Sequence, residues 1–289
     1  MRRFDEYNPL TQAVYYLCVI CITMFSMNPV ILAVSLASSV LTFCLYGKGK
    51  ARDHLFALLL FLILAVINPL VSHNGATVLF YLNSRPFTLE ASLYGIAAAA
   101  MVTAVLYRLR MLSREMTSDK VIYLTGRLSP KLSLLLSMSL RYVTLFKHRW
   151  HIIRDSQKAL GLFDDGNLID AVRGRVRVLN ILITWALEQG IVTAESMEAR
   201  GWGSRRRTSF ALYRITAADI LLILLITGLT AVSAPGIHNA PIDYYPSLAM
   251  DLFTPLSIAG YICYGLVSIL PVIINTKEAI RWRCLRSAI

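Results

Sequence analysis

The stretch NLIDAVRGRVRVLNILITWALEQGIVTAESMEARGWGSRRRT, residues 167–208, organises this chain of 289 residues. Its apolar residues recur at steps of three and four, which places them on one face of an α-helix that Asn167 is suited to cap. Gly201 is well placed to end this helix, which at 1.5 Å per residue would be roughly 50 Å long. The apolar face comprises Leu168, Val172, Val176, Leu179, Ile183, Leu187, Gly190, Ala194 and Met197.

This helix is longer than a bilayer core is thick, yet its charges argue against a place inside a bilayer. Gly174 and Gly190 weaken it by about 1 kcal/mol each relative to alanine, so a bend is allowed. We therefore interpret the helix as a cytoplasmic lever whose tip presents Arg200.

The composition indicates a membrane protein. Hydrophobic residues make up 56% of the chain, and the mean hydropathy is +0.57, which is too apolar for an ordinary soluble domain. A net charge of +12 fits nucleic-acid binding in a soluble protein. In a membrane protein it fits cytoplasmic Lys and Arg better, so no nucleic-acid partner is expected. Cys18 and Cys21 have CxxC spacing, but inside an apolar run we expect them to be packing residues.

Six apolar runs are each close to the roughly 20 residues that a bilayer core requires. A shorter apolar piece, 77–82, is expected to lie at the interface or to re-enter the membrane. The predicted fold is an all-α polytopic membrane protein with membrane helices in 1–107 and 212–289 and a cytoplasmic coupling region in 108–211. The predicted spans are 10–27, 29–46, 55–72, 88–107, 212–234 and 247–274.

The distribution of basic residues predicts the orientation. With Arg2 and Arg3 on the cytoplasmic side and six crossings, every Lys and Arg except Arg85 falls inside, so 28 of the 29 are cytoplasmic. The sequence therefore predicts a multi-pass plasma-membrane protein with both termini in the cytoplasm.

Recognisable catalytic motifs are missing from the sequence. It contains no GxxxxGK[ST], HExxH or GxSxG pattern, so we expect no ATP hydrolysis, no enzymatic activity and no cofactor. His148 and His151 lie one helical turn apart and have the spacing of two metal ligands. The neighbouring cations Lys147, Arg149 and Arg154 favour a basic surface over a metal site.

The acidic residues near the spans lie toward the span ends. They are Asp53, Glu90, Asp219 and Asp251. An ionisable group at mid-bilayer costs at least ~2.5 kcal/mol and usually marks an ion path, and we predict none. This pattern argues against a proton- or sodium-coupled transporter and favours a membrane region that packs against an apolar partner.

The segment Glu198-Ala199-Arg200-Gly201-Trp202-Gly203, followed by Arg205-Arg206-Arg207-Thr208, resembles the second Ala-Arg-Gly signature of energy-coupling factor (ECF) transporter T components. This family includes the membrane subunits of cobalt permeases. The resemblance extends to Asn8-Pro9-Leu10-Thr11 and to the tail 278–287.

The resemblance implies a function. In this family a T component joins two cytoplasmic ABC-type ATPases to a membrane S component that carries a vitamin or a metal ion. The signature arginines insert into the ATPases, so Ala199, Arg200 and Gly201 are the expected docking tip. The run Arg205, Arg206 and Arg207 is a weaker candidate. The alternative for Arg200 is a cation that merely suits the negative end of a helix dipole.

The first signature departs from the family pattern. The matching stretch is Asp155 to Gly161, and Leu160 stands where the family has arginine. Ala159, Leu160 and Gly161 are therefore weaker docking candidates. This arm is expected to dock through apolar contact or less tightly, which suggests two non-identical ATPases or a fused pair.

The tail and the overall function each have two interpretations. The basic residues of the tail suit anionic lipids, which we favour, or the ATPases. For the whole chain we favour the coupling subunit of an ECF-type importer. The alternative is a membrane scaffold or sensor that recruits a cytoplasmic protein without transport. The basic residues of the tail are Lys277, Arg281, Arg283 and Arg286.

Overall fold

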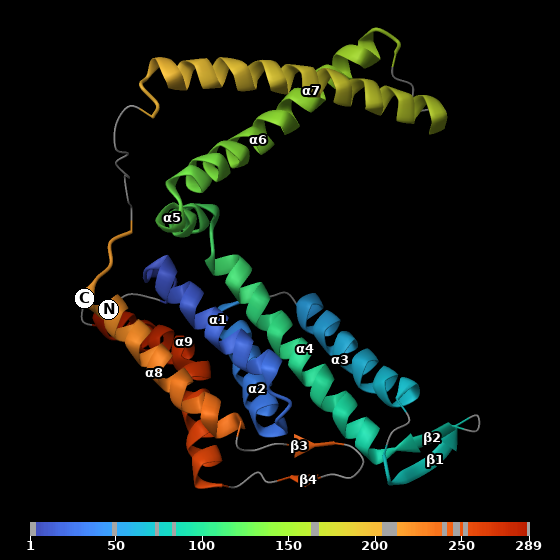
Figure 1. Ribbon diagram of the computed structural model, residues 1–289, viewed down its shortest axis with the longest axis vertical. Coiled ribbons are helices and arrows are strands. Elements are labelled where there is room, and N and C mark those ends of the chain that lie inside the picture. Colours follow the sequence, from blue (N-terminus) through green and yellow to red (C-terminus); the bar gives the residue numbers. More distant parts are fainter. Residues whose placement is uncertain are drawn as a thin grey trace. The chain divides into compact units, whose positions relative to one another are not determined.

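The chain folds into two compact helical units (Figure 1). The first comprises Met1–Ser118 and Tyr213–Ile289, and the second comprises Asp119–Leu212. The predicted all-α polytopic fold is confirmed. The computed structural model describes residues 4–47, 51–72, 75–82, 85–162, 168–203, 213–238, 242–244, 249–250 and 254–287.

The first unit is a bundle of apolar helices with two short pairs of antiparallel strands, β1 with β2 and β3 with β4. Asn8 and Asn28 cap the first two helices, and each is followed by a proline at the first helical position, which suits a helix start. Its elements are η1 (Phe4–Glu6), α1 (Pro9–Phe25), α2 (Pro29–Tyr46), α3 (Ala51–Val71), β1 (Val78–Leu82), β2 (Arg85–Thr88), α4 (Leu89–Glu115), α8 (Ala217–His238), β3 (Ile242–Asp243), β4 (Ala249–Met250) and α9 (Pro255–Ser287).

The second unit contains α5 (Ser118–Leu128), α6 (Pro130–Ala159) and α7 (Leu168–Ala199). Helix α7 is the predicted long helix, about 48 Å at 1.5 Å per residue, and it runs without interruption through both glycines. Helices α6 and α7 cross (Figure 1) around a small core centred on Ile153 and Val178. Ser129 occupies the N-cap position of α6, but its hydroxyl makes no capping hydrogen bond.

Six described helices are long and apolar enough to cross a bilayer, as predicted in number but not in membership. They are α2, α3, α4, α7, α8 and α9. Helix α7 qualifies because its charged residues, apart from Glu188, lie toward its two ends. Helix α1, with 17 residues, is a shorter apolar helix.

Several predicted boundaries were wrong. Helix α4 continues to Glu115, eight residues beyond the predicted end of the fourth span at residue 107. Helix α9 begins at Pro255 rather than 247, because 249–250 pair in β4, and it continues through the expected tail to Ser287. The short apolar piece 77–82 forms β1, which pairs with β2.

Small residues allow close contact between helices, and Gly95 of α4 is one of them. A Cβ atom there would lie 3.0 Å from the Ala65 carbonyl oxygen of α3. Helices α8 and α9 meet in the same way, since a Cβ at Gly236 would lie 2.7 Å from the Leu256 carbonyl oxygen and 2.9 Å from the Gly260 Cα. Lipid tails are as apolar as the helix surfaces, so the hydrophobic effect does not drive helices together inside a membrane. Close packing at small residues supplies van der Waals attraction instead.

The N-terminal segment closes the bundle. Phe4, Tyr15 and Tyr16 form a buried aromatic cluster with edge-on rings, and the centroids lie 5.2 Å apart for Phe4–Tyr15 and 5.1 Å for Tyr15–Tyr16. The Phe4 amide donates to Asn275 Oδ1 of α9 at 2.8 Å, and the Asn8 amide donates to Asp219 Oδ1 of α8 at 3.0 Å. Helix α1 is therefore an integral member of the bundle.

The Gly236 contact gives a first prediction. Gly236→Ala should destabilise the protein by about 1–3 kcal/mol, because the new methyl group meets the α9 backbone, which has little freedom to move. The measurement is the thermal unfolding midpoint of the protein in detergent. Gly228→Ala is the matched control in the same helix, since nothing lies within 4 Å of its added Cβ. Equal effects of the two substitutions would contradict the close α8–α9 packing.

Candidate functional site

The tip of α7 is a tightly closed helix end. After Ala199 the chain turns at Gly201, whose φ of +77° is the left-handed conformation that glycine adopts without strain. The Trp202 amide donates to the Met197 carbonyl oxygen at 3.0 Å, and the Gly201 amide donates to that of Glu198 at 2.8 Å. These two bonds define a Schellman motif, which satisfies the last carbonyl groups of the helix with backbone donors alone.

The tip of α6 is built in the same way. Gly161 has a φ of +67°. The Leu162 amide donates to the Gln157 carbonyl oxygen at 3.0 Å, and the Gly161 amide donates to that of Lys158 at 3.0 Å. The two regions singled out in the sequence are therefore two copies of one backbone motif, with Leu160 and Arg200 at the matching position.

Both tips expose their side chains. Leu160 is 68% exposed, Trp202 is 47% exposed, and Ala159 and Ala199 are also exposed. Within the part of the chain that the structure describes, the side chain of Arg200 makes no hydrogen bond or ion pair. Since the helix end is closed by backbone bonds, Arg200 is not required to close it. Arg205, Arg206 and Arg207 lie outside the described residues.

The crossing of α6 and α7 holds the two tips apart. Arg177 of α7 donates from Nη1 to the carbonyl oxygen of Leu162 at 3.1 Å, which fixes the α6 tip against the first half of α7. The path from Arg177 to Arg200 along α7 is roughly 35 Å at 1.5 Å per residue. The two tips are therefore separate points on one unit.

Polar and aromatic contacts stiffen this crossing. The hydroxyls of Tyr142 and Thr193 lie 2.7 Å apart, and the rings of Phe146 and Trp185 meet edge-on at 6.0 Å. The guanidinium of Arg149 lies 5.2 Å from the Trp185 ring centroid, a cation–π contact. These contacts lie along the length of the crossing and limit its bending.

The predicted apolar face of α7 is not the face that packs against α6. The packed face carries Ala171 and Val178, which are buried. The predicted face is a continuous exposed stripe, about 29 Å long from residue 172 to 191. An apolar stripe of this kind marks a surface for another apolar partner. The stripe comprises five exposed residues of the predicted face, Val172, Val176, Leu179, Ile183 and Leu187, and is extended by Ile191, which was not among the predicted residues.

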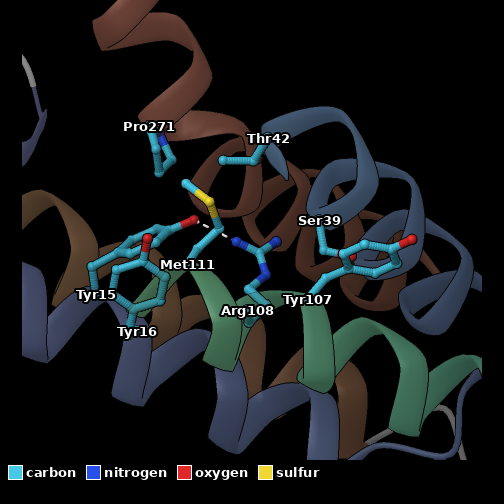
Figure 2. A pocket seen from close by; sticks show the side chains of 8 residues that line it. All are labelled: Tyr15, Tyr16, Ser39, Thr42, Tyr107, Arg108, Met111 and Pro271. Carbon is cyan, nitrogen blue, oxygen red and sulfur yellow. Dashed lines mark hydrogen bonds between the residues drawn. The ribbon is translucent and has the colours of Figure 1, made fainter. Parts of the chain in front are cut away.

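A buried cation of the first unit lies directly after the predicted fourth span. Arg108 of α4 is only 3% exposed. Its Nη1 donates to the Tyr15 hydroxyl of α1 at 2.6 Å (Figure 2). Its Nη2 donates to Ser38 Oγ of α2 at 2.7 Å and to Ser268 Oγ of α9 at 2.5 Å. The sequence prediction missed this residue because the expected span ended at residue 107.

Neutral oxygens surround Arg108. Among the described residues it makes no ion pair, and its Nε has no acceptor. Glu115, two turns further along α4, accepts a hydrogen bond from the Tyr16 hydroxyl at 2.9 Å. Arg108 thus joins four helices through a shared set of hydrogen bonds. It also lines a narrow pocket (Figure 2) with Tyr15, Tyr16, Ser39, Thr42, Tyr107, Met111 and Pro271.

Two acidic residues near the span ends are buried and serve the local backbone. Glu90, 2% exposed, accepts from the Thr77 hydroxyl at 2.7 Å, and Asp219, 1% exposed, accepts from the Thr216 hydroxyl at 2.6 Å. The described residues contain no group of three or more His, Cys, Asp or Glu side chains suited to a metal ion.

Comparison with known proteins identifies relatives for part of the chain. The chain is 36% identical over 101 residues, 34% of its length, to the energy-coupling factor transporter transmembrane protein EcfT of Streptococcus thermophilus. The predicted resemblance to ECF T components is confirmed. Proteins of the same name from Streptococcus equi subsp. equi and Listeria innocua are 35% identical over 98 residues and 34% identical over 96 residues.

The resemblance covers a limited part of these proteins. The alignments span 38%, 36% and 36% of the relatives' own lengths. No family model matches the chain. The ECF resemblance therefore rests on these pairwise similarities and on the signature residues at the α7 tip.

The tip geometry gives a second prediction. Gly201→Ala places a side chain in the left-handed region, which destabilises the closed helix end by about 1–2 kcal/mol. The Trp202 amide, which donates to Met197 in this closed end, should therefore exchange with solvent ~5- to 30-fold faster. Hydrogen exchange with mass spectrometry measures this rate. Gly190→Ala, in the same helix with nothing within 4 Å of the added Cβ, should leave it unchanged. An unchanged rate in Gly201→Ala would refute the cap.

The Arg108 network gives a third prediction. Arg108→Ala removes bonds to three other helices and leaves a cavity, so the free energy of unfolding should fall by about 2–5 kcal/mol. Arg110→Ala, two residues along, removes a half-exposed ion pair with Asp53 and should cost less than about 1 kcal/mol. Thermal unfolding in detergent compares the two, and similar losses would show that Arg108 does not anchor the bundle.

Proposed function

We propose that this chain is the transmembrane coupling component of an ECF-type importer. In this role it transmits motion from two cytoplasmic ABC-type ATPases to a membrane S component that holds the substrate, a vitamin or a metal ion. The observation that carries the proposal is the pair of matching helix tips on one crossed-helix unit, the second of which presents the exposed Arg200. The similarity to EcfT proteins supports it.

The proposed topology places α1 in the membrane and α7 in the cytoplasm. Helix α1 contains no charged residue, whereas α7 contains seven. If α7 crossed in place of α1, the basic residues 48–52 and 108–127 would lie outside the cell, against the positive-inside rule. With α1 crossing, both termini lie in the cytoplasm of a prokaryotic cell.

The sequence indicates which subunits of the proposed complex hydrolyse ATP. The chain lacks a phosphate-binding loop, so ATP hydrolysis belongs to the partner subunits and this chain acts as a non-catalytic subunit. The exposed apolar stripe of α7 suits contact with an apolar surface of the S component. Basic residues of the C-terminal part of α9, including Lys277 and Arg281, suit anionic lipid headgroups.

Arg200 is proposed to dock in an ATPase because arginine keeps its charge and offers a planar fork to a carboxylate. Arg200→Glu should therefore abolish co-purification of an ABC-type ATPase with this chain, or reduce it by at least about tenfold. Co-elution from detergent and ATPase activity of the eluted complex measure the effect.

Arg141→Glu supplies the control, since it makes the same charge change at an exposed position of α6 away from the tips. Loss of the ATPase with both variants would assign the effect to net charge rather than to docking. If wild-type chain retains no ATPase at all, the function is instead that of a scaffold or sensor for another cytoplasmic protein.

A further inference from the structure

The matching backbones of the two tips allow a comparison of their side chains, position by position. Three hydrogen bonds recur at each end, and the corresponding N–O distances agree within 0.2 Å: 3.1 and 3.2 Å, 3.0 and 2.8 Å, and 3.0 and 3.0 Å for α6 and α7. Both glycines are left-handed. The side chains at matching positions therefore leave the helix end in corresponding directions.

The alanine and the glycine are shared by both tips, but the side chains at three other exposed positions differ in chemistry. Leu160 of α6 corresponds to Arg200 of α7, so an aliphatic group replaces a cation. Two residues earlier, Lys158 corresponds to Glu198, which reverses the charge. Two residues later, the half-exposed Leu162 corresponds to Trp202. One scaffold thus presents an apolar tip with a flanking cation and a cationic tip with a flanking anion.

A single kind of socket does not suit both tips. A socket that holds Arg200 needs a carboxylate, and the same carboxylate facing Leu160 would lose its hydration without gaining a partner. A dry apolar socket suits Leu160, which is 68% exposed, and would exclude a guanidinium. The specificity of each tip for its own socket thus depends on two effects: the favourable contact with that socket and the unfavourable contact with the other one.

We propose that the α6 tip docks through Leu160 and Leu162 into an apolar socket that lacks a carboxylate facing Leu160, while the α7 tip docks through Arg200 into an acidic socket. The inference rests on the proposed function, in which both tips contact ATPases. It follows that the two sockets belong to different chains, or to the unlike halves of a fused one. Leu160 is thus a determinant of which ATPase surface the α6 tip accepts.

Photo-cross-linking at matched positions tests this proposal. The photoreactive residue p-benzoyl-L-phenylalanine replaces Lys158 in one protein and Glu198 in another, both at the same position of the Schellman motif. Each full-length protein is co-expressed with the candidate ABC-type ATPases of its source organism and irradiated in membranes, and mass spectrometry locates the cross-linked peptides. The expected result is two different peptides from ATPase chains, with Asp or Glu beside the α7-tip site and an apolar surface at the α6-tip site.

Substitutions at Leu160 show how the cross-linking yield at the α6 tip depends on the polarity of this side chain. Leu160→Arg should lower the yield at the α6 tip by at least about tenfold, because it places a charge in an apolar socket. Leu160→Ser should lower it less, and Leu160→Met should preserve it. The yield at the α7 tip in each variant shows whether the protein is folded and assembled. If Leu160→Arg disrupts folding, the Leu160→Ser comparison decides.

Two results would overturn the proposal in distinguishable ways. If both tips cross-link to the same peptide of one ATPase, or if Leu160→Arg raises the yield at the α6 tip, the sockets are alike; the inference fails and the proposed function stands. If neither tip cross-links to a protein with a nucleotide-binding loop, the proposed function fails, and the inference fails with it.

Discussion

A guanidinium placed among apolar helices needs oxygen acceptors from several directions at once, and the first unit is arranged around this requirement. Arg108 reaches hydroxyls on α1, α2 and α9, so the helices that supply them must keep a fixed separation and rotation. The Tyr15 hydroxyl also donates to the backbone carbonyl oxygen of Ser268, three residues before Pro271 in α9. The buried charge thus adds specificity to a set of apolar surfaces that would otherwise pack in several ways.

The second unit depends on a different constraint, the closure of exposed helix ends. A helix that ends in water leaves carbonyl groups to be satisfied, and α6 and α7 both satisfy them with a left-handed glycine and backbone donors. Because the side chains take no part in this closure, they are free to vary. The same backbone tip therefore carries leucine in one helix and arginine in the other without loss of the fold.

Periodicity and composition were sufficient to predict the fold class, the α7 helix and the glycine at its end, because each depends on local sequence. The prediction failed where tertiary contacts override local signals. Arg108 was placed outside the fourth span because a charge normally ends a span, and only partners from distant helices make its burial tolerable. The α6 tip was recognised from its resemblance to the family signature. That it shares its backbone hydrogen bonds with the α7 tip could be learned only from the structure.

Coupling between two docking points requires that force applied at one tip moves the other rather than bending the helix between them. The roughly 35 Å of α7 from Arg177 to the tip is unbroken helix. Tyr142, Phe146 and Arg149 of α6 contact it along the crossing. The apolar stripe on another face of α7 runs from residue 172 to 191 and overlaps much of this segment, so a partner on that surface would follow a rotation of α7. The crossed pair of α6 and α7 has two unlike tips and one long apolar face. Unequal movements of the two tips would therefore tilt a partner protein bound to the stripe.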